Sequence, residues 1–325
     1  MMNKIILIGA GQLGSRHLQG IAKSNIDISI EVVEPFEKSR EIAKKRYEEI
    51  EKNPKIKSID FFESIDQLSD TLDVVIIATN ADVRSKIIKE LLLKKKVKNL
   101  ILEKVLFQRE EEYHEIEKLL GETSTKCWVN HPRRTFPFYQ TLKNEIKDCE
   151  QISYMVQGGA WGLGCNGLHF IDHLSFLSDS ADLKIDNDFL HPHVYEAKRA
   201  DYVEFNGLLK GRIGNHIFAL YSDKEPVPVS VTITTDTLTA FIDESNGYAR
   251  IARKSKDWEW EASQQKIVYF QSELTNIVVD EIISTGSCAL PTYDEAMKLH
   301  IPFIQALLSH MESVNNQVYT LCPIT

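Results

Sequence analysis

Two histidines follow a glycine-rich stretch in the middle of the chain and could handle protons. His169 and His173 lie four residues apart in a segment with helical spacing, so both side chains fall on one face of a helix. Histidine has its ordinary pKa close to neutral pH and therefore serves as a general acid or base. The same pair could bind a metal ion, but no HExxH pattern accompanies it. We therefore expect no metal site and a structural role for His173, while an acid–base role stays open for this part of the helix.

A lysine that follows an apolar run is the next candidate. Lys104 comes shortly after Leu100-Ile101-Leu102, which predicts a buried strand. At the end of such a strand its amine could donate a hydrogen bond to a substrate oxygen, and desolvation readily lowers a lysine pKa. An exposed lysine at the start of a loop is the alternative, and position alone does not decide between the two.

The chain begins with the pattern of a dinucleotide-binding strand, turn and helix. Residues 5–8 predict a buried strand, and Gly9, Gly11 and Gly14 follow with GxGxxG spacing. Gly9 allows the tight turn, Gly11 lets backbone N–H groups approach a pyrophosphate, and Gly14 lets the helix pack closely on the sheet. The N-terminus of that helix then faces the phosphates with its positive dipole end.

An acid follows the second apolar run. Glu34 comes directly after residues 30–33, about twenty residues beyond Gly14, at the spacing of an acid that binds the adenosine ribose. A carboxylate there accepts hydrogen bonds from the ribose hydroxyls and repels a 2′-phosphate. NAD is therefore the expected cofactor and NADP the less favoured one, although Lys38 and Arg40 lie just downstream and could bind a phosphate.

Strand and helix signals alternate in the first part of the chain and change later. The alternation predicts an α/β Rossmann domain over residues 1–128, with a parallel doubly wound sheet. Period-two runs such as residues 227–234 and the Asn246-Gly247 turn predict an α+β domain over residues 129–325 with a large, mostly antiparallel open sheet. Ligands bind beyond the carboxyl ends of parallel strands, so the cofactor residues should gather in one crevice. They are Gly9, Gly11, Gln12, Leu13, Gly14, Glu34, Thr79, Asn80, Glu103 and Lys104.

The composition is that of an ordinary globular protein. Of the 325 residues, 43% are hydrophobic and 26% charged, and no apolar run reaches the length of a membrane span. A net charge of −9 argues against nucleic acid as a partner. Five cysteines without a CxxC pair fit a reducing compartment. The first strand begins by about Asn3 and leaves no room for a signal peptide, so we expect a cytoplasmic protein.

With these motifs the chain resembles the Gfo/Idh/MocA oxidoreductases, the relatives of glucose–fructose oxidoreductase and inositol dehydrogenase. The resemblance covers nearly the whole length. It rests on residues 9–18, on Glu103-Lys104, on residues 130–137, on residues 167–172 and on residues 290–296. In the family the lysine of a Glu-Lys-Pro motif and the histidine of a Gly-x-His-x-x-Asp motif are catalytic, which assigns those roles to Lys104 and His169. Here Val105 replaces the proline.

The resemblance implies an NAD(P)-dependent oxidoreductase that moves a hydride between nicotinamide and a hydroxyl-bearing carbon of a sugar, polyol or sugar nucleotide. His169 would exchange the hydroxyl proton and Lys104 would polarise the reacting oxygen. The resemblance also implies a homodimer or homotetramer formed through the sheet of the second domain. Residues expected near the substrate are Trp161, Cys165, Asn166, Asp172 and Arg134.

One departure from the family pattern bears on the chemistry. Cys165 stands where many members carry an aspartate, four residues before the catalytic histidine. A thiol of ordinary pKa is mostly neutral at pH 7 and cannot stabilise an imidazolium as a carboxylate does. Either Asp172 or another acid supplies that charge, or the chemistry is atypical, or activity is lost. Two alternatives therefore stay open: a nucleotide-binding sensor or assembly protein without turnover, and a lyase or epimerase that retains bound NAD.

Overall fold

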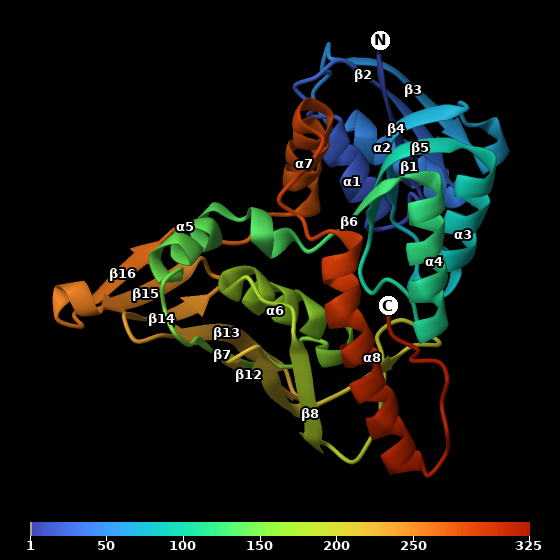
Figure 1. Cartoon of the computed structure of the whole chain (residues 1–325). Coiled ribbons are helices and arrows are strands. Elements are labelled where there is room, and N and C mark those ends of the chain that lie inside the picture. Colours follow the sequence, from blue (N-terminus) through green and yellow to red (C-terminus); the bar gives the residue numbers. More distant parts are fainter. Residues whose placement is uncertain (1) are drawn as a thin grey trace. The chain divides into compact units, whose positions relative to one another are not determined.

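The computed structural model describes residues 2–325, and their contacts divide the chain into two units (Figure 1). The first unit comprises Met1–Phe107, Glu111–Asn130 and Tyr269–Asp294, and the second comprises Gln108–Glu110, His131–Val268 and Glu295–Thr325. The sequence-based division at residues 128 and 129 differs mainly for Tyr269–Asp294. This segment returns to the first unit because α7 (Gln271–Thr285) buries apolar side chains in the same core as the parallel strands.

The first unit contains a sheet of six parallel strands in the order β3-β2-β1-β4-β5-β6. The strands are β1 (Asn3–Ile8), β2 (Ile28–Val33), β3 (Ile56–Phe62), β4 (Thr71–Ile77), β5 (Lys96–Leu102) and β6 (Lys126–Val129). The helices between them are α1 (Gly14–Ile21), α2 (Glu37–Glu48), α3 (Ala81–Lys94) and α4 (Glu110–Thr123), with a 3-10 turn at Ile65–Gln67. The predicted doubly wound α/β fold is confirmed.

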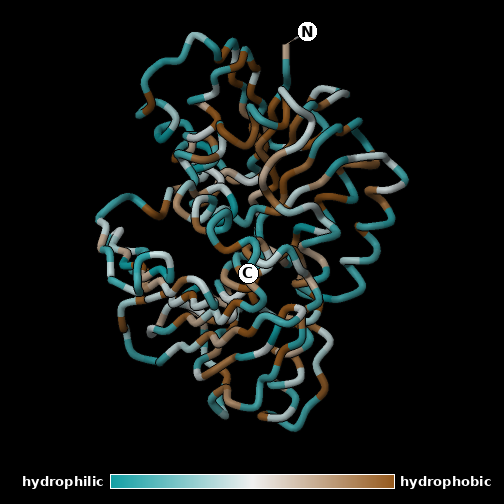
Figure 2. The backbone as a smooth tube through the Cα atoms, turned by 60° about the vertical axis from the view of Figure 1, so that its left-hand side comes forward, coloured by the Kyte–Doolittle hydropathy of each residue, from teal (hydrophilic) through white to brown (hydrophobic). Residues whose placement is uncertain are grey.

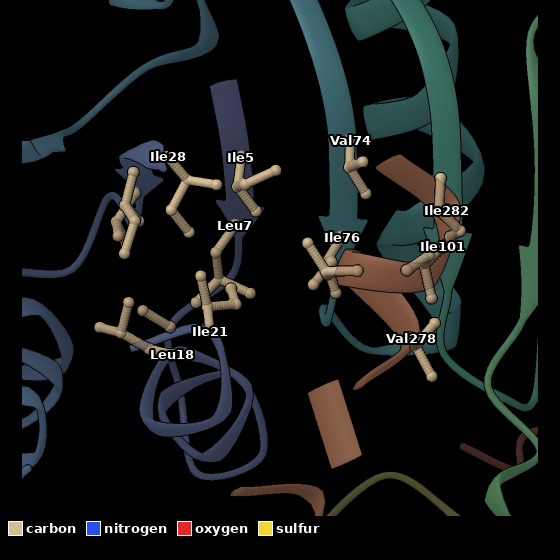
Figure 3. Packing of buried hydrophobic residues seen from close by; sticks show 14 of the residues in the cluster. Ile5, Leu7, Leu18, Ile21, Ile28, Val74, Ile76, Ile101, Val278 and Ile282 are labelled. Carbon is tan, nitrogen blue, oxygen red and sulfur yellow. The ribbon is translucent and has the colours of Figure 1, made fainter. Parts of the chain in front are cut away.

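A hydrophobic core joins this sheet to α1, α2 and α7 (Figure 3). Alternate residues of a strand point to the same face, so β1 and β4 each contribute a row of branched side chains. In Figure 2 the parallel strands are drawn mostly in brown, the colour of hydrophobic residues. Each fully buried side chain of this kind contributes about 1.5–3 kcal/mol relative to an exposed one. The core includes Ile5, Leu7, Leu18, Ile21, Val74, Ile76, Val278, Val279 and Ile282.

The second unit contains an open sheet of eight strands in the order β16-β15-β14-β13-β7-β12-β11-β8. Only the β7–β12 pair is parallel, so the predicted large and mostly antiparallel sheet is confirmed. Its strands are β7 (Ser153–Gly159), β8 (Leu183–Leu190), β11 (Gly207–Ile213), β12 (His216–Asp223), β13 (Val227–Thr234), β14 (Leu238–Asp243), β15 (Tyr248–Arg253) and β16 (Trp260–Gln264). Around it lie α5 (Pro137–Ile146), α6 (Leu163–Ser178), α8 (Tyr293–Asn315), the 3-10 turns Pro132–Thr135 and Lys254–Lys256, and the hairpin of β9 (Tyr195–Glu196) and β10 (Val203–Glu204).

Three general features of residues 2–325 bear on function. Within this range no helix combines the length and the apolar character that crossing a bilayer requires. None of the five cysteines in it forms a disulfide. Nor does any group of three or more His, Cys, Asp or Glu side chains in it have an arrangement that could hold a metal ion.

Candidate active site

A cavity of about 580 Å³ opens at the carboxyl ends of β1, β2 and β4. Gly9 and Gly11 line it after β1, Glu34 after β2, and Thr79 and Asn80 after β4. The strand order reverses between β1 and β4, and doubly wound sheets bind their ligands at such a reversal. The structure therefore brings together five of the residues that the sequence assigned to cofactor binding.

The glycines of the opening motif have distinct steric roles. Gly9 has φ +85°, and a Cβ on it would lie 2.8 Å from Cγ2 of Thr79. A Cβ on Gly14 would lie 1.8 Å from the carbonyl oxygen of Gly9, so α1 can approach β1 this closely only with glycine there. By contrast, Gly11 has open space where its Cβ would be. Open space beside backbone N–H groups is what a bound pyrophosphate needs.

Glu34 is held in place by the backbone on both sides of it. Its Oε2 accepts a hydrogen bond from the Ala10 N–H at 2.8 Å, and its Oε1 accepts one from the Phe36 N–H at 3.1 Å. A carboxylate offers about four lone-pair sites, so acceptor capacity remains for the hydroxyls of a ribose. The carboxyl is thus fixed at the edge of the cavity with room for further bonds.

The lining of this cavity is acidic. Besides Glu34 it includes Glu63, Asp82 and Glu90, whereas no lysine or arginine among residues 2–325 lines it. Arg40 donates to the backbone oxygens of Glu34 and Pro35 at 2.7 and 2.8 Å and to Glu63 at 2.7 Å. These bonds engage the guanidinium that could otherwise have bound a 2′-phosphate. The side chains that line the cavity therefore carry a net negative charge.

Gln12 and Leu13 do not line the cavity in this structure. The side-chain oxygen of Gln12 accepts a hydrogen bond from Arg46 at 2.7 Å. Leu13 is 43% exposed and occupies the N-cap position of α1. Their part in cofactor binding stays a prediction.

Glu103, which directly precedes Lys104, forms hydrogen bonds within the first unit. Its Oε1 lies 2.8 Å from Nε2 of His17 and accepts a hydrogen bond from Nδ2 of Asn130 at 2.6 Å. His17 Nδ1 in turn lies 3.1 Å from Oγ1 of Thr275. Burial raises the pKa of Glu103, but the bonds and charge of His17 and then Asn130 outweigh it, so the pKa is lowered. The carboxylate therefore fixes the chain at the point where β5 ends and Lys104 begins the next loop.

Arg84 is a buried residue to which the sequence assigned no contacts. Its guanidinium, in a side chain that is 1% exposed, donates to the backbone carbonyls of Thr79, Val105 and Leu106. It thereby ties the cavity loop after β4 to the loop that contains Lys104. The helical pattern contained a signal, because Arg84 falls on the stripe of α3 that is otherwise buried, and a buried cation needs carbonyl or acid partners.

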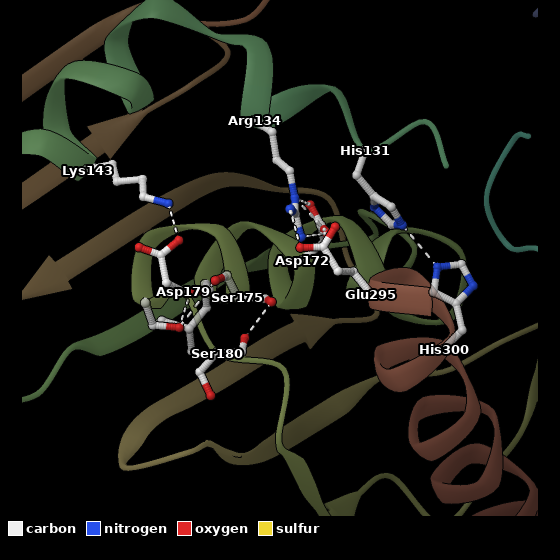
Figure 4. A network of polar contacts seen from close by, with 11 residues as sticks. His131, Arg134, Lys143, Asp172, Ser175, Asp179, Ser180, Glu295 and His300 are labelled. Atoms are coloured by element: carbon white, nitrogen blue, oxygen red, sulfur yellow. Dashed lines mark hydrogen bonds and ion pairs between the residues drawn. The ribbon is translucent and has the colours of Figure 1, made fainter. Parts of the chain in front are cut away.

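In the second unit, His169 lies in the second turn of α6 beside two further imidazoles. Its ring meets the ring of His131 edge-on, with 5.3 Å between centroids. Nε2 of His131 lies 3.0 Å from Nε2 of His300, and both side chains are buried (Figure 4). One hydrogen must lie between these two nitrogens, so one imidazole donates and the other accepts. The three histidines form a continuous row of groups able to hold protons.

His173 has a different environment from His169. Its Nδ1 lies 2.9 Å from the Tyr154 hydroxyl, and its ring stacks at a tilt on Tyr139, 3.9 Å between centroids. Burial, together with the charges of Arg133 and Arg134, holds the pKa of His173 well below its ordinary value. A neutral, hydrogen-bonded imidazole of this kind fits the structural role expected for it.

Asp172 and Arg134, both expected near the substrate, bind each other (Figure 4). Nε of Arg134 lies 3.1 and 3.0 Å from the two carboxylate oxygens, and Nη2 lies 2.8 Å from one of them. Burial raises the pKa of Asp172, against the opposing charge and hydrogen bonds of Arg134. Both oxygens are thus engaged by a guanidinium, and the pair fixes α6 to the segment that begins the second unit.

A different acid lies at the N-terminus of α6. Glu204, from β10, accepts hydrogen bonds from the backbone N–H groups of Gly164, of Cys165 at 3.4 Å and of Phe205 at 3.0 Å. Burial raises its pKa, and the thiol of Cys165 hydrogen-bonds to it. Glu204 therefore places a carboxyl beside Cys165, the residue that stands where the family aspartate is missing. Its two-residue strand has no motif, so the sequence offered no signal for it.

A second cavity, of about 480 Å³, brings together three of the expected substrate residues. Trp161, Cys165 and Asn166 line it together with Glu204, whereas Arg134 and Asp172 do not. The indole Nε1 of Trp161 donates to a backbone oxygen at 2.9 Å, and Nδ2 of Asn166 donates to the carbonyl of Trp161 at 2.7 Å. These bonds hold the glycine-rich loop before α6 in one shape.

Comparison with known proteins agrees with this architecture. Residues 3–131 match the family model GFO_IDH_MocA, described as an oxidoreductase family with an NAD-binding Rossmann fold. No curated protein matches the sequence. Among solved structures, UDP-N-acetylglucosamine 3-dehydrogenase GnnA from Acidithiobacillus ferrooxidans is 15% identical, with 94% of this chain and 97% of that chain covered and a TM-score of 0.69.

Two further structures have the same fold. The super-repressor mutant of Gal80p from Saccharomyces cerevisiae is 14% identical, with 97% and 98% of the two chains covered and a TM-score of 0.74. An oxidoreductase from Agrobacterium radiobacter, in complex with NAD+, L-tartaric acid and magnesium, is 12% identical, with 98% of each chain covered and a TM-score of 0.70. At these identities the likeness shows a shared fold.

Proposed function

We propose that the protein is an NAD-dependent dehydrogenase of a sugar, polyol or sugar nucleotide, because residues 3–131 match the Gfo/Idh/MocA family model. The observation that carries the proposal is the acidic cavity at the ends of β1, β2 and β4, with Glu34 fixed at its edge. Thr79 also lines this cavity. Its Oγ1 is buried and has no hydrogen-bond partner among residues 2–325, so it could bind a polar group of a ligand. A nicotinamide cofactor bound there supplies the hydride chemistry.

In this proposal two side chains act on the substrate hydroxyl. His169 takes or returns the hydroxyl proton, and the His131–His300 pair behind it offers further positions for that proton. Lys104 donates a hydrogen bond to the reacting oxygen, and the bonds of Glu103 to His17 and Asn130 fix the start of its loop. Lys104 belongs to the first unit and His169 to the second.

A regulatory protein that binds the nucleotide without turnover is the second candidate. Cys165 favours it, because the carboxylate expected one helical turn before His169 is absent from that position. One structural neighbour is described as a super-repressor mutant, of Gal80p. The presence of both Lys104 and His169 opposes it, since a protein that only binds a nucleotide has no need of an acid–base pair.

The test is a substrate screen with the purified protein. Hexoses, polyols, sugar phosphates and sugar nucleotides are offered with NAD, and the appearance of reduced nicotinamide is followed by its absorbance. If the protein is a dehydrogenase, at least one of these substrate classes should be oxidised, and the His169→Ala variant should lose that activity. Tight NAD binding by calorimetry with no turnover of any class would favour the regulatory candidate instead.

A further inference from the structure

Arg40 has a guanidinium that backbone carbonyls hold beside the 580 Å³ cavity of the first unit. The residue lies in the first turn of α2, and its side chain is 13% exposed. Its Nη1 donates to the carbonyl oxygen of Glu34 at 2.7 Å and to that of Pro35 at 2.8 Å. Both of these residues line the cavity. The guanidinium is thus a fixed positive group against the backbone of the acid that we assign to the adenosine ribose.

Glu63 binds the other end of this guanidinium. Its Oε1 accepts a hydrogen bond from Nη2 of Arg40 at 2.7 Å, and Glu63 itself lines the cavity. It follows β3, whose last residue, Phe62, accepts a hydrogen bond from the Glu34 N–H at 3.0 Å. The N–H of Glu63 donates to Oε1 of Gln67 at 3.0 Å. These bonds fix the backbone of Glu63 close to Glu34, and its side chain reaches Nη2 of Arg40 from there.

The ion pair between Arg40 and Glu63 contributes little to the stability of the fold. The carboxylate of Glu63 is 69% exposed, and water and salt screen an ion pair in such a position. Arg40 has its two carbonyl partners besides this acid. The fold therefore does not depend on Glu63, although Glu63 forms part of the cavity wall.

We propose that Glu63 excludes NADP from this cavity, because it occupies the position on Arg40 that the 2′-phosphate would take. The inference rests on the proposed function and deepens it, since it adds to Glu34 a second acid that selects NAD. In dinucleotide-binding folds, an arginine near the acid that binds the ribose accommodates the 2′-phosphate of NADP. Arg40 has the planar fork that binds an oxyanion, and its Nη2 reaches a residue of the cavity wall. With Glu63 on Nη2, a phosphate there meets a negative charge in place of an open donor.

The two acids act on different parts of the ligand. The carboxylate of Glu34 is held by the N–H groups of Ala10 and Phe36 and does not bond to Glu63, so it still accepts hydrogen bonds from the ribose hydroxyls when Glu63 is replaced. Loss of Glu63 alone should therefore leave NADH binding intact and admit NADPH. Loss of Glu34, by contrast, should weaken NADH binding. This difference separates the two acids experimentally.

The experiment is calorimetric titration of the full-length protein with NADH and with NADPH. The test variant is Glu63→Ala, and a second variant combines Glu63→Ala with Arg40→Ala. The matched control is Glu90→Ala, because Glu90 also lines the cavity and accepts a hydrogen bond from a cation, Lys94, at 2.8 Å. Test and control each remove one negative charge from the cavity wall and break an ion pair, but only the test variant opens Nη2 of Arg40. Melting temperatures verify that each variant is folded.

The unchanged protein should bind NADH more tightly than NADPH. Glu63→Ala should raise the affinity for NADPH about 10- to 100-fold, as expected for a hydrogen bond between charged groups, while the affinity for NADH stays nearly unchanged. Glu90→Ala should raise the NADPH affinity much less, and the added Arg40→Ala should abolish the gain. An unchanged NADPH affinity in Glu63→Ala, an equal gain in Glu90→Ala, or a gain that survives the loss of Arg40 would each overturn the proposal.

Binding affinities separate this inference from the function on which it rests, because none of the titrations requires hydride transfer. If NADH binds and the NADPH affinity does not respond to Glu63, the inference is overturned and the dehydrogenase proposal stands. If the NADPH affinity responds as expected while no substrate of the screen is oxidised, the inference is supported and the dehydrogenase proposal loses ground. If neither dinucleotide binds to the unchanged protein or to Glu63→Ala, both proposals are overturned.

Discussion

His17 Nε2 lies 2.8 Å from Glu103 Oε1, and both side chains are buried in the first unit. His17 belongs to the helix that follows the glycine motif, and Glu103 to the end of β5, next to Lys104. The nucleotide-binding motif and the proposed catalytic lysine are therefore joined through one hydrogen bond. A substitution at Glu103 should therefore affect both the nucleotide-binding motif and Lys104.

Glu103→Gln should lower the free energy of unfolding by about 1–3 kcal/mol, because a buried charged hydrogen bond to His17 is lost. The pKa of Glu103 is lowered in the folded protein. The contribution of Glu103 to the free energy of unfolding is therefore complete above its ordinary pKa of 4.5, and it is lost as the pH falls through the lowered pKa of the folded state. The variant should accordingly lose less stability on acidification in that window. Urea unfolding followed by circular dichroism measures both effects. Glu63→Gln, whose carboxylate is largely exposed, is the control and should change little.

Replacement of Glu34 tests the cofactor preference. The unchanged protein should bind NADH more tightly than NADPH, because four acids and no basic side chain among residues 2–325 line the cavity. Glu34→Ala should weaken NADH binding about 10-fold, through lost charged hydrogen bonds, and narrow the difference between the two cofactors. Calorimetric titration with each cofactor gives these affinities. Tighter binding of NADPH by the unchanged protein would contradict the assignment of Glu34.

His169→Ala should lower turnover by roughly 10²–10⁴-fold while NAD affinity stays nearly unchanged, as expected for a general base. Lys104→Ala should behave likewise, since its proposed contact is with the reacting oxygen. Steady-state kinetics with a substrate from the screen, paired with NAD titration, provides the measurement. Full activity of His169→Ala would refute the mechanism without affecting the fold.

The cysteine before His169 allows a test of the missing carboxylate. Cys165→Ser should be mild, because it preserves the size and the hydrogen bond to Glu204. Cys165→Asp should raise the pKa of the His169 imidazolium, since an added negative charge favours the protonated form. The lower limb of the pH–rate profile should then move to higher pH. Addition of Glu204→Gln, which removes the competing acid, should increase this shift of the pH–rate profile. A profile that does not move would argue against an electrostatic role for position 165.

Assembly is the last expectation. One face of the eight-stranded sheet exposes Met155, Ile217 and Tyr221 on the neighbouring strands β7 and β12. We propose that this face pairs with a second copy of the chain, because exposed apolar patches commonly mark interfaces. Light scattering should give a multiple of 37.2 kDa, and Met155→Glu with Ile217→Glu should reduce it to the monomer mass. Leu93→Glu, on the exposed side of α3, is the control. A monomer mass for the unchanged protein at micromolar concentration would contradict the proposal.

The elements that could be predicted from the sequence are those with strong local signals. The glycine motif and the buried strand before Thr79 have unambiguous periodicity, and parallel-sheet topology then requires their ends to converge. Glu34 followed from its distance to the motif alone. For these parts, short-range pattern and a topological rule are sufficient.

The contacts that could not be predicted join residues far apart in the chain. Glu204 lies against Cys165, and His300 against His131, more than a hundred residues away in the latter case. No local period encodes such a pairing, because it depends on how α6, α8 and the β9–β10 hairpin pack. Arg84 is intermediate, since its helical stripe predicts burial but not which carbonyls it binds.

The return of Tyr269–Asp294 to the first unit has a consequence for how the protein is made. Val278, Val279 and Ile282 complete a core whose other side chains emerge from the ribosome early in synthesis. The nucleotide-binding unit therefore stays incomplete, with apolar surface open to water, until Tyr269–Asp294 has been translated. A fragment that ends near residue 130 would lack α7 and should aggregate. Protease resistance of the nascent chain should first appear when Tyr269–Asp294 has left the ribosome.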